Sequence, residues 1–341
     1  MSLTRRMFLQ ALATGALLPT TSLFASAPLK QTINTLPAPG AIRRVVSAGS
    51  PADVLMIAAA PEKLLGLSSF DFSRKANGLL PETIRQLPKY GRLVGGGSTL
   101  PLETLLSLKP DVIIDCGSAD ETWLSQAKRI SDQTQIPWVL INGELIHSAR
   151  QLTTVGEILG VEERTHNQAE LAQHFISDAL TFSRSAAANL RFYAARGPRG
   201  LETGLQGSLH TEAAELLGLE NVARIAGRSG LTQVSIENLL LWQPDIILVQ
   251  DKTTLTSLLN DPAWRGVSAV AHHRILLLQG LPFGWLDAPP GINRLLGMRR
   301  LQAWIDPTIR PQFQSDMQLY SRLFWHNELS EQRYKTLVDA R

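Results

Sequence analysis

The sequence predicts an α/β protein with two β/α lobes, each built on a mainly parallel sheet, bridged by one long α-helix. Segments typical of helices and strands alternate in both halves of the chain, as in parallel sheets covered by helices. Between the halves, the 27 residues from Glu162 to Ala188 have a helical pattern without Gly or Pro. A helix–turn–strand sequence also occurs twice, as LETLLSLKPDVIID (102–115) and IENLLLWQPDIILV (236–249).

The two copies of this repeat match over their whole length. Glu103 corresponds to Glu237, 134 residues later, and Asp111 corresponds to Asp245 in the same register. The repeat indicates two lobes in a pseudo-twofold arrangement, although chance similarity between two amphipathic units is an alternative. Ligands of open parallel sheets bind beyond the carboxyl ends of the strands, so a ligand is expected between the lobes.

The first 27 residues have the features of an export signal. Arg5 and Arg6 precede an apolar stretch, and the small residues Ala25 to Ala27 offer a cleavage site. The string TRRMFL resembles a twin-arginine signal, with an ordinary secretory signal as the alternative. No later window is apolar for about 18 residues, so we expect a soluble periplasmic protein.

The pattern divides the rest of the chain into five segments. They are a Pro-containing linker (28–40), an N-terminal α/β lobe (41–160), a connecting helix (161–188), a C-terminal α/β lobe (189–308) and a helical tail (309–341).

Each lobe has its own series of elements. In the first lobe we expect strands at 43–49, 111–115 and 137–142, and helices at 50–66, 101–109 and 123–135. Ser50 is the expected N-cap of the first helix, with Pro51 at its first position. In the second lobe we expect strands at 190–195, 245–249 and 273–279, and helices at 208–218 and 235–243.

Composition narrows the class of protein. Hydrophobic residues make up 44% and charged residues 18% of the chain, which is a globular balance. The formal net charge of +3 falls to +1 without Arg5 and Arg6 of the signal, too little for a nucleic-acid-binding surface. Cys116 is the one cysteine, so an intrachain disulfide and a multi-cysteine zinc site are excluded, and we expect this side chain to be buried.

Several stretches together resemble a known family. They are RRVVSAGSPADVLMIAAAPEKLLGLS (43–68), GLETGLQGSLHTEAAELLGLENVA (200–223), DPAWRGVSAVAHHRILLL (261–278) and FGWLDAPPGINRLLGMRRL (283–301). In this order they resemble the periplasmic binding proteins of ABC importers for ferric siderophores, haem and cobalamin. The last stretch is similar to a subgroup associated with iron complexes and with molybdate or tungstate.

The resemblance implies a role for the repeated glutamates. In this family each lobe presents an acidic residue to arginines of the two permease copies, and Glu103 and Glu237 stand at those positions. Charge pairs of this kind chiefly set orientation and encounter rate. The alternative is that each glutamate only complements a helix N-terminus. The expected partner is therefore an ABC permease dimer of the inner membrane, with the chain itself a monomer.

Candidate ligand-binding residues come from the loops at strand ends, such as FDFSRK (70–75), YGRLVGGGST (90–99) and LPFGW (281–285). Arginines suit an anionic ligand, aromatic rings such as Tyr193 and Phe283 suit a planar chelate, and the run from Gly95 to Thr99 either presents amides to an anion or forms a turn with a helix cap. The full candidate set is Ser50, Tyr90, Arg92, Gly97, Ser98, Arg196, Ser208, His210, Arg228 and Trp285.

These features leave several hypotheses for function. We expect a solute-binding protein for a ferric complex, most readily a ferric siderophore, with no resident cofactor or metal and no catalytic residues. Molybdate or tungstate, held by hydroxyls and amides such as those of Ser98 and Ser208, is the alternative ligand, and haem and cobalamin lack a convincing axial ligand. An exported metal-cofactor enzyme is disfavoured because hydrolase, zinc-protease and dinucleotide motifs are missing from the sequence. A partner-binding adaptor with an empty cleft is a further hypothesis.

Overall fold

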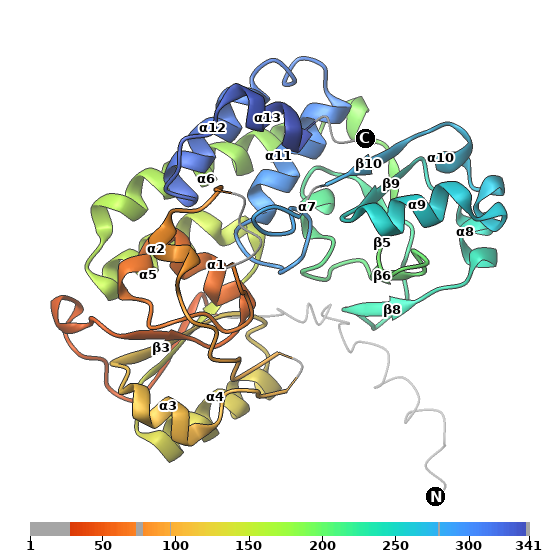
Figure 1. The fold of residues 1–341 in the computed structure, drawn as a ribbon. Helices are drawn as coiled ribbons and strands as arrows, with labels where there is room; N and C mark the ends of the chain where they lie inside the picture. Colours follow the sequence, from red (N-terminus) through yellow and green to blue (C-terminus); the bar gives the residue numbers. More distant parts are fainter. Residues whose placement is uncertain (1–27, 73–77, 96, 279, 339–341) are drawn as a thin grey trace, which may run out of the picture.

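The computed structural model describes residues 28–72, 78–95, 97–278 and 280–338. Figure 1 shows two lobes side by side, with one long helix and the C-terminal helices lying across both of them. The predicted fold class, two lobes with mainly parallel sheets bridged by a long helix, is confirmed. The predicted export signal, residues 1–27, lies outside the described residues.

The sheet of the first lobe has the strand order β1-β4-β3-β2. Strands β2 (Val45–Ser47), β3 (Val112–Gly117) and β4 (Trp138–Asn142) are parallel, and β1 (Lys30–Ile33) pairs antiparallel with β4. Every residue of β2, β3 and β4 is buried, as expected for parallel strands covered on both faces. Residues 28–40, predicted as a linker, therefore contain an edge strand. In this strand, KQTI, exposed and half-buried residues alternate over only four positions, most of them polar, so the sequence gives little sign of a strand.

The described residues of the first lobe form five α-helices and three 3₁₀ segments. The α-helices are α1 (Ser50–Ala59), α2 (Glu82–Arg85), α3 (Leu102–Leu108), α4 (Glu121–Thr134) and α5 (Ser148–Leu159), and the 3₁₀ segments are η1 (Pro39–Ala41), η2 (Pro61–Lys63) and η3 (Leu145–His147). Helix α1 is buried on nearly all sides, which explains its lack of a polar face. Its N-cap is Gly49, so Ser50 is the first helical residue, and its expected capping role is wrong.

The sheet of the second lobe has the order β10-β9-β5-β7, and all its pairs are parallel. Its strands are β5 (Arg191–Ala195), β7 (Glu220–Asn221), β9 (Ile246–Val249) and β10 (Ile275–Leu277), while β6 (Glu202–Gly204) and β8 (Leu231–Gln233) form a separate antiparallel pair. The helices of this lobe are α7 (Glu212–Glu215), α8 (Ile236–Trp242), α9 (Lys252–Asn260), α10 (Ser268–Ala271) and η5 (Pro262–Gly266).

Helix α6 (Glu162–Phe182) connects the lobes and ends before η4 (Ala186–Ala188). At 1.5 Å per residue its 21 residues extend about 32 Å. The chain then builds the second lobe and returns through α11 (Arg294–Ile305), α12 (Phe313–Phe324) and α13 (Glu331–Val338). Helices α11 and α12 pack on α6, and α12 also packs on α1 of the first lobe, so the C-terminal helices cover both halves (Figure 1).

The repeated sequence forms the same structure in both lobes. Helices α3 and α8 each end in a left-handed residue, Lys109 (φ 46°) and Gln243 (φ 46°). The aspartate that follows each turn accepts a hydrogen bond from backbone that leads into a neighbouring strand: Arg44 N to Asp111 Oδ2 at 2.9 Å, and Arg191 N to Asp245 Oδ2 at 2.7 Å. The Arg44 guanidinium donates to the carbonyl oxygen of Leu108, the last residue of α3, and the Arg191 guanidinium donates to that of Gln243, which directly follows α8. The repeat is thus structural and fixes α3 and α8 alike against their sheets.

Cys116 is buried at the end of β3, and burial raises the pKa of its thiol to about 12, so the expectation of a buried side chain is confirmed. None of the helices within the described residues combines the length and apolar character needed to span a membrane.

Candidate functional site

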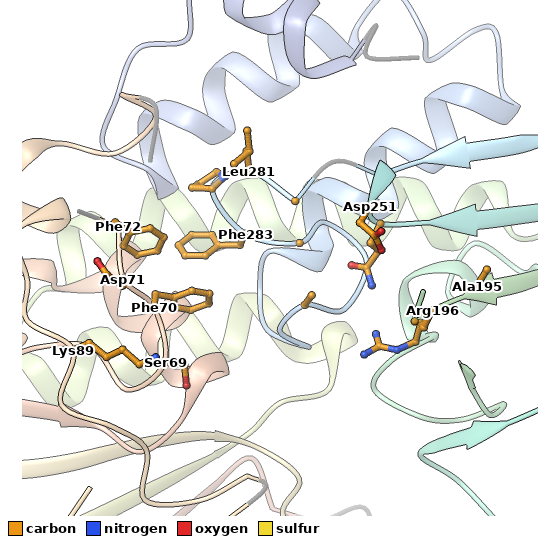
Figure 2. A pocket seen from close by; sticks show the side chains of 16 residues that line it. Ser69, Phe70, Asp71, Phe72, Lys89, Ala195, Arg196, Asp251, Leu281 and Phe283 are labelled. Carbon is orange, nitrogen blue, oxygen red and sulfur yellow. The ribbon is translucent and has the colours of Figure 1, made fainter. Parts of the chain in front are cut away.

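A cleft of about 620 Å³ lies between the lobes, where the carboxyl ends of the two sheets face each other. The first lobe contributes Lys89 and the segment 69–72 that follows η2, and the second contributes the loops after β5, β9 and β10 (Figure 2). The described residues that line it are Ser69, Phe70, Asp71, Phe72, Lys89, Ala195, Arg196, Gly197, Gln250, Asp251, Gly280, Leu281, Pro282, Phe283, Gly284 and Ala288.

Three phenylalanine rings form one wall of the cleft. Phe70 and Phe72 are stacked with centroids 5.2 Å apart, and Phe283 meets both of them edge-on at 5.2 and 5.7 Å. Figure 2 shows the three rings grouped at one side of the cavity, with Phe283 arriving from the second half of the chain. Such a cluster offers an apolar surface to flat or ring-bearing parts of a ligand.

Charged groups lie on the other surfaces of the cleft. Lys89 and Arg196 are the basic side chains among the described lining residues, and they come from different lobes. Asp251 caps α9, with its carboxylate accepting from Thr254 N at 2.8 Å and Thr254 Oγ1 at 2.7 Å. Its charge is therefore partly satisfied within the protein. Asp71 also lines the cleft, so the described lining holds two acidic and two basic side chains.

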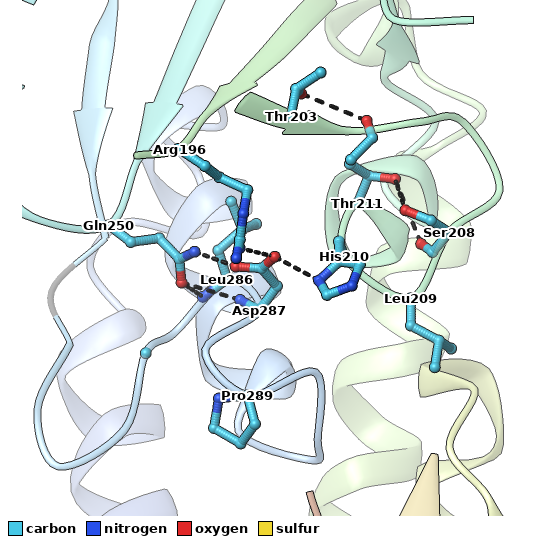
Figure 3. A network of polar contacts seen from close by, with 12 residues as sticks. Arg196, Thr203, Ser208, Leu209, His210, Thr211, Gln250, Leu286, Asp287 and Pro289 are labelled. Carbon is cyan, nitrogen blue, oxygen red and sulfur yellow. Dashed lines mark hydrogen bonds and ion pairs between the residues drawn. The ribbon is translucent and has the colours of Figure 1, made fainter. Parts of the chain in front are cut away.

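A buried aspartate organises the second-lobe wall (Figure 3). Asp287 is 2% exposed, and its carboxylate bonds to Arg196, to the side-chain amide of Gln250 and to His210 Nδ1, the last at 2.7 Å. Its backbone N–H donates to Gln250 Oε1 at 3.0 Å. Arg196 also bonds to Glu202 at 3.1 Å. When Nδ1 of a neutral His210 donates to Asp287, its Nε2 is left as an acceptor.

A second hollow of about 440 Å³ lies on the His210 side of this network and is more polar. Loops from both lobes line it, including the ends of β3 and β4. The described lining residues are Gly117, Ser118, Ala119, Asp120, Asn142, Glu144, Gly207, Ser208, Leu209, His210, Ser229 and Gly230.

A third hollow of about 390 Å³ opens beside the cleft in the first lobe and shares Ser69 and Lys89 with it. Tyr90 and Arg92 line this hollow. The glycine-rich run that follows does not cap a helix, because α3 begins only at Leu102. At the end of the run the chain turns back, because Thr99 N and Leu100 N both donate to the carbonyl oxygen of Arg92, at 2.8 and 3.1 Å. The prediction of a helix cap at Ser98 or Thr99 is wrong.

Two buried carboxylic acids stand behind the cleft surfaces of the first lobe. Asp53, in α1, accepts hydrogen bonds from Ser47, from Ser68 and from the backbone of Ser69, and so holds the loop that carries the phenylalanines. Burial raises its pKa to about 6, although these hydrogen bonds oppose the rise. Asp115, at the end of β3, accepts from Trp123 Nε1 at 2.7 Å, and burial raises its pKa to about 6 as well.

The structure distributes the ten predicted ligand residues unevenly. Arg196 lines the cleft, Ser208 and His210 line the second hollow, and Tyr90 and Arg92 line the third. The other five are not among the described residues that line these three hollows: Ser50, Gly97, Ser98, Arg228 and Trp285.

Trp285 was predicted to contact the ligand, and this prediction is wrong. Its side chain is 1% exposed in the main hydrophobic core, and its indole N–H donates to the carbonyl oxygen of Leu281 at 2.9 Å. Tyr193 is also buried, with its hydroxyl donating to the carbonyl oxygen of Gly200 at 2.8 Å. Phe283, which the sequence indicated, does line the cleft. Phe70 and Phe72 come from the loop at 70–75 that the sequence indicated, but they were not singled out as candidates.

Asp287 and Gln250 were not predicted. Asp287 lies in the stretch FGWLDAPPGINRLLG, which supported the family resemblance, but an isolated aspartate before two prolines gives no sign of its partners. Gln250 directly follows the buried strand β9, a position typical of ligand loops. Its place directly after a buried strand could have identified Gln250 as a candidate ligand-binding residue from the sequence.

The two repeated glutamates both lie on the molecular surface. Glu103 and Glu237 are each the second residue of their helix, and both side chains are exposed. Hydrogen bonding to Ser235 lowers the pKa of Glu237, so it is ionised at neutral pH.

Among the described residues there is no group of three or more His, Cys, Asp or Glu side chains placed to hold a metal ion.

Comparison with known proteins identifies the family. Residues 70–280 match the family described as periplasmic binding protein. The molybdate-binding protein MolA of Haemophilus influenzae is 28% identical over 301 residues, which cover 78% of this chain and 82% of MolA. An ABC transporter solute-binding protein of Sulfurospirillum deleyianum superposes with a TM-score of 0.78 at 27% identity, over 87% of this chain and 94% of that one. The vitamin B12-binding protein BtuF of Vibrio cholerae has the same fold, with a TM-score of 0.61 at 20% identity over 80% and 99% of the two chains.

Proposed function

The chain belongs to the periplasmic binding protein family, whose members are the solute-binding components of ABC importers, and we propose that it captures a ferric complex of the siderophore class. The ligand binds in the cleft between the lobes and is delivered to an ABC permease dimer. Glu103 and Glu237 dock the two lobes on that dimer. The proposed role is capture and delivery, without a catalytic step.

The observation that supports this ligand class is the phenylalanine wall of the cleft. Phe70, Phe72 and Phe283 line a cavity of about 620 Å³, which lies within the range of about 300–1,000 Å³ for small-molecule pockets. A catecholate or similar chelate has flat rings that fit such a wall and an overall negative charge. Lys89, on the first lobe, would pair with that charge, whereas Arg196, on the second lobe, is already paired with Asp287 and Glu202.

Capture requires limited motion of the lobes. Helix α6 connects them in one continuous element, and α11 and α12 pack along it. A rigid connection of this kind favours small changes in the angle between the lobes over a wide hinge opening. The ligand therefore meets a cleft that is largely formed in advance, which lowers the ordering cost of binding.

Calorimetric titration of residues 28–341 tests the ligand class. We expect saturable binding of a ferric tris-catecholate or ferric citrate complex, together with a rise in melting temperature. Phe70→Ala is expected to weaken binding several-fold, since aromatic contacts contribute about 0.5–1.5 kcal/mol. Phe70→Leu, which keeps an apolar side chain without the ring, is the matched control for the ring itself. No response to either ferric complex would reject the proposal.

Molybdate or tungstate is a second candidate because of the similarity to MolA. The second hollow is lined by Ser118, Ser208 and Ser229, whose hydroxyls could donate to a small oxyanion, although the acidic residues Asp120 and Glu144 line it as well. Under this hypothesis molybdate alone saturates the protein, and Ser208→Ala weakens its binding while Phe70→Ala leaves it unchanged. The same pair of variants thus separates the two ligand classes.

A further inference from the structure

The two repeated helices concentrate exposed apolar side chains. The described residues include eight large hydrophobic side chains that are exposed, and three of these lie on α3 and α8, which have seven residues each. Leu106 is 49% exposed on α3, and on α8 Leu240 and Leu241 are 40% and 80% exposed. A single exposed leucine is ordinary on a protein surface, whereas neighbouring exposed apolar groups on one short helix are typical of interaction sites.

The exposed leucine has the same position in both lobes. Leu106 is three residues after Glu103, and Leu240 is three residues after Glu237. Side chains three apart on a helix share a face, so each glutamate and leucine form one continuous patch. Leu105 and Leu239, the residues just before the exposed leucines, are fully buried, so the core-facing side of each helix is already occupied.

Both patches are held in the same way. Each helix ends in a left-handed residue and is tied to its sheet through Asp111 or Asp245. The sequence therefore preserves an acidic group beside an apolar one, together with the backbone that orients them. Preservation of Glu alone would not require a leucine at 106 and again at 240.

We propose that each docking surface on the permease is composite, with a glutamate and the leucine one helical turn later: Glu103 with Leu106, and Glu237 with Leu240. This rests on the proposed function as a component of an importer. The fitting partner is a twofold-symmetric membrane protein that presents, once per copy, a basic side chain beside an apolar depression. The glutamate directs approach and register, and the leucine excludes water from the contact.

The two patches are not equal. Leu241 extends the apolar area on α8, whereas the corresponding residue of α3 is Ser107. The second lobe therefore offers the larger apolar contact. We expect Leu240→Ser to impair docking more than Leu106→Ser.

Photo-cross-linking in the intact envelope of the native host tests the inference. A benzophenone amino acid is placed in the full-length chain at 103, 106, 237 or 240, and at 180 and 259 as controls, since Leu180 and Leu259 are exposed leucines on α6 and α9. Cross-linked partners are identified by mass spectrometry. We expect positions 106 and 240 to yield the same integral membrane permease subunit, with at least fivefold less product from the controls.

The other outcomes are equally informative. Products from 103 and 237 but not from 106 and 240 would overturn the composite surface and leave the proposed function intact. A product with a second copy of this chain would overturn it in favour of self-association. No permease product from any of the four positions would reject docking through these helices, whereas ligand capture is judged separately by calorimetry. Positions 107 and 241 serve as replacements if a variant at 106 or 240 has a lowered melting temperature.

Discussion

Arg294, which is buried, and Glu212, which is partly exposed, form an ion pair whose contacts reach both lobes. Arg294 is 1% exposed, and its Nη1 lies 2.7 Å from Glu212 Oε2. The same guanidinium donates through Nη2 to the carbonyl oxygen of Gly143 in the first lobe at 2.5 Å, while Glu212 Oε1 accepts from Leu145 N at 2.7 Å. Each partner therefore contacts the loop after β4, and the pair fixes that loop against the second lobe.

Removing this pair should destabilise the protein strongly. Arg294→Met leaves the Glu212 carboxylate and the Gly143 carbonyl oxygen without their partner, and breaking a buried pair costs about 3–5 kcal/mol. Urea denaturation followed by circular dichroism measures the free energy of unfolding. Lys128→Met, which breaks an exposed pair with Asp132, is the control, with an expected change of about 1 kcal/mol or less. Equal effects of the two substitutions would contradict this assignment.

The buried acids Asp53 and Asp115 should make stability fall as pH rises from about 4 to about 6. Burial raises the pKa of each from 3.8 to about 6, so in this range the native state binds more protons than the unfolded state. The free energy that protonation of these acids adds to folding is complete below the pKa of the unfolded state, and it is lost as the pH rises through the pKa of the folded state. For each group it amounts to about 3 kcal/mol.

The experiment compares Asp53→Asn and Asp115→Asn with the wild type at pH 4.5, 5.5, 6.5 and 7.5. Each variant should gain stability relative to the wild type as pH rises, because the amide cannot ionise. Asp132→Asn, at an exposed position, should show no such trend. A difference between wild type and Asp53→Asn that does not change with pH would mean that Asp53 is ionised without penalty in the native state.

Asp287 should control ligand affinity through the side chains that it holds. Asp287→Asn weakens its bonds to Arg196 and His210, which then lose their fixed positions between the cleft and the second hollow. We expect at least a tenfold loss of affinity for the ferric complex in calorimetry. Glu202→Gln, which removes the other carboxylate on Arg196 but leaves His210 fixed, should have a smaller effect. Unchanged affinity of Asp287→Asn would assign the network to structure alone.

Charge reversal at both repeated glutamates should separate delivery from capture. The double variant Glu103→Arg/Glu237→Arg is expected to abolish uptake of the labelled ligand by cells, because both docking charges become repulsive toward a basic partner. Ligand affinity of the purified protein should not change, since both side chains lie on the surface outside the lining of the cleft. Normal uptake by this variant would be incompatible with docking through α3 and α8.

The arrangement of strands and helices could be predicted in outline from the sequence. The alternation of elements and the repeat at 102–115 and 236–249 indicated two similar lobes, and the buried β3 and β9 confirm the strands that those stretches predicted. Strand β1 was missed because four residues with alternating exposure differ little from a linker. Its pairing with β4 depends on contacts more than 100 residues apart, which local pattern does not report.

The site was harder to predict than the fold. Loops that line the cleft were identified from strand ends, but the direction of each side chain depends on packing across the lobes. Trp285 illustrates this, since it lies in a loop that reaches the cleft and yet turns into the core. Asp287 illustrates the converse, because its partners come from three separate loops that only the folded chain brings together.

The return of the chain to the first lobe has a consequence for how the protein folds. Helix α12 packs on α1, and His326 Nε2 lies 2.8 Å from the carbonyl oxygen of Ile57 across 269 residues of chain. The core of the first lobe is therefore completed by residues that are synthesised after the whole second lobe. Contacts so distant in sequence slow folding, so the nascent first lobe should remain an incomplete intermediate until α12 has left the ribosome.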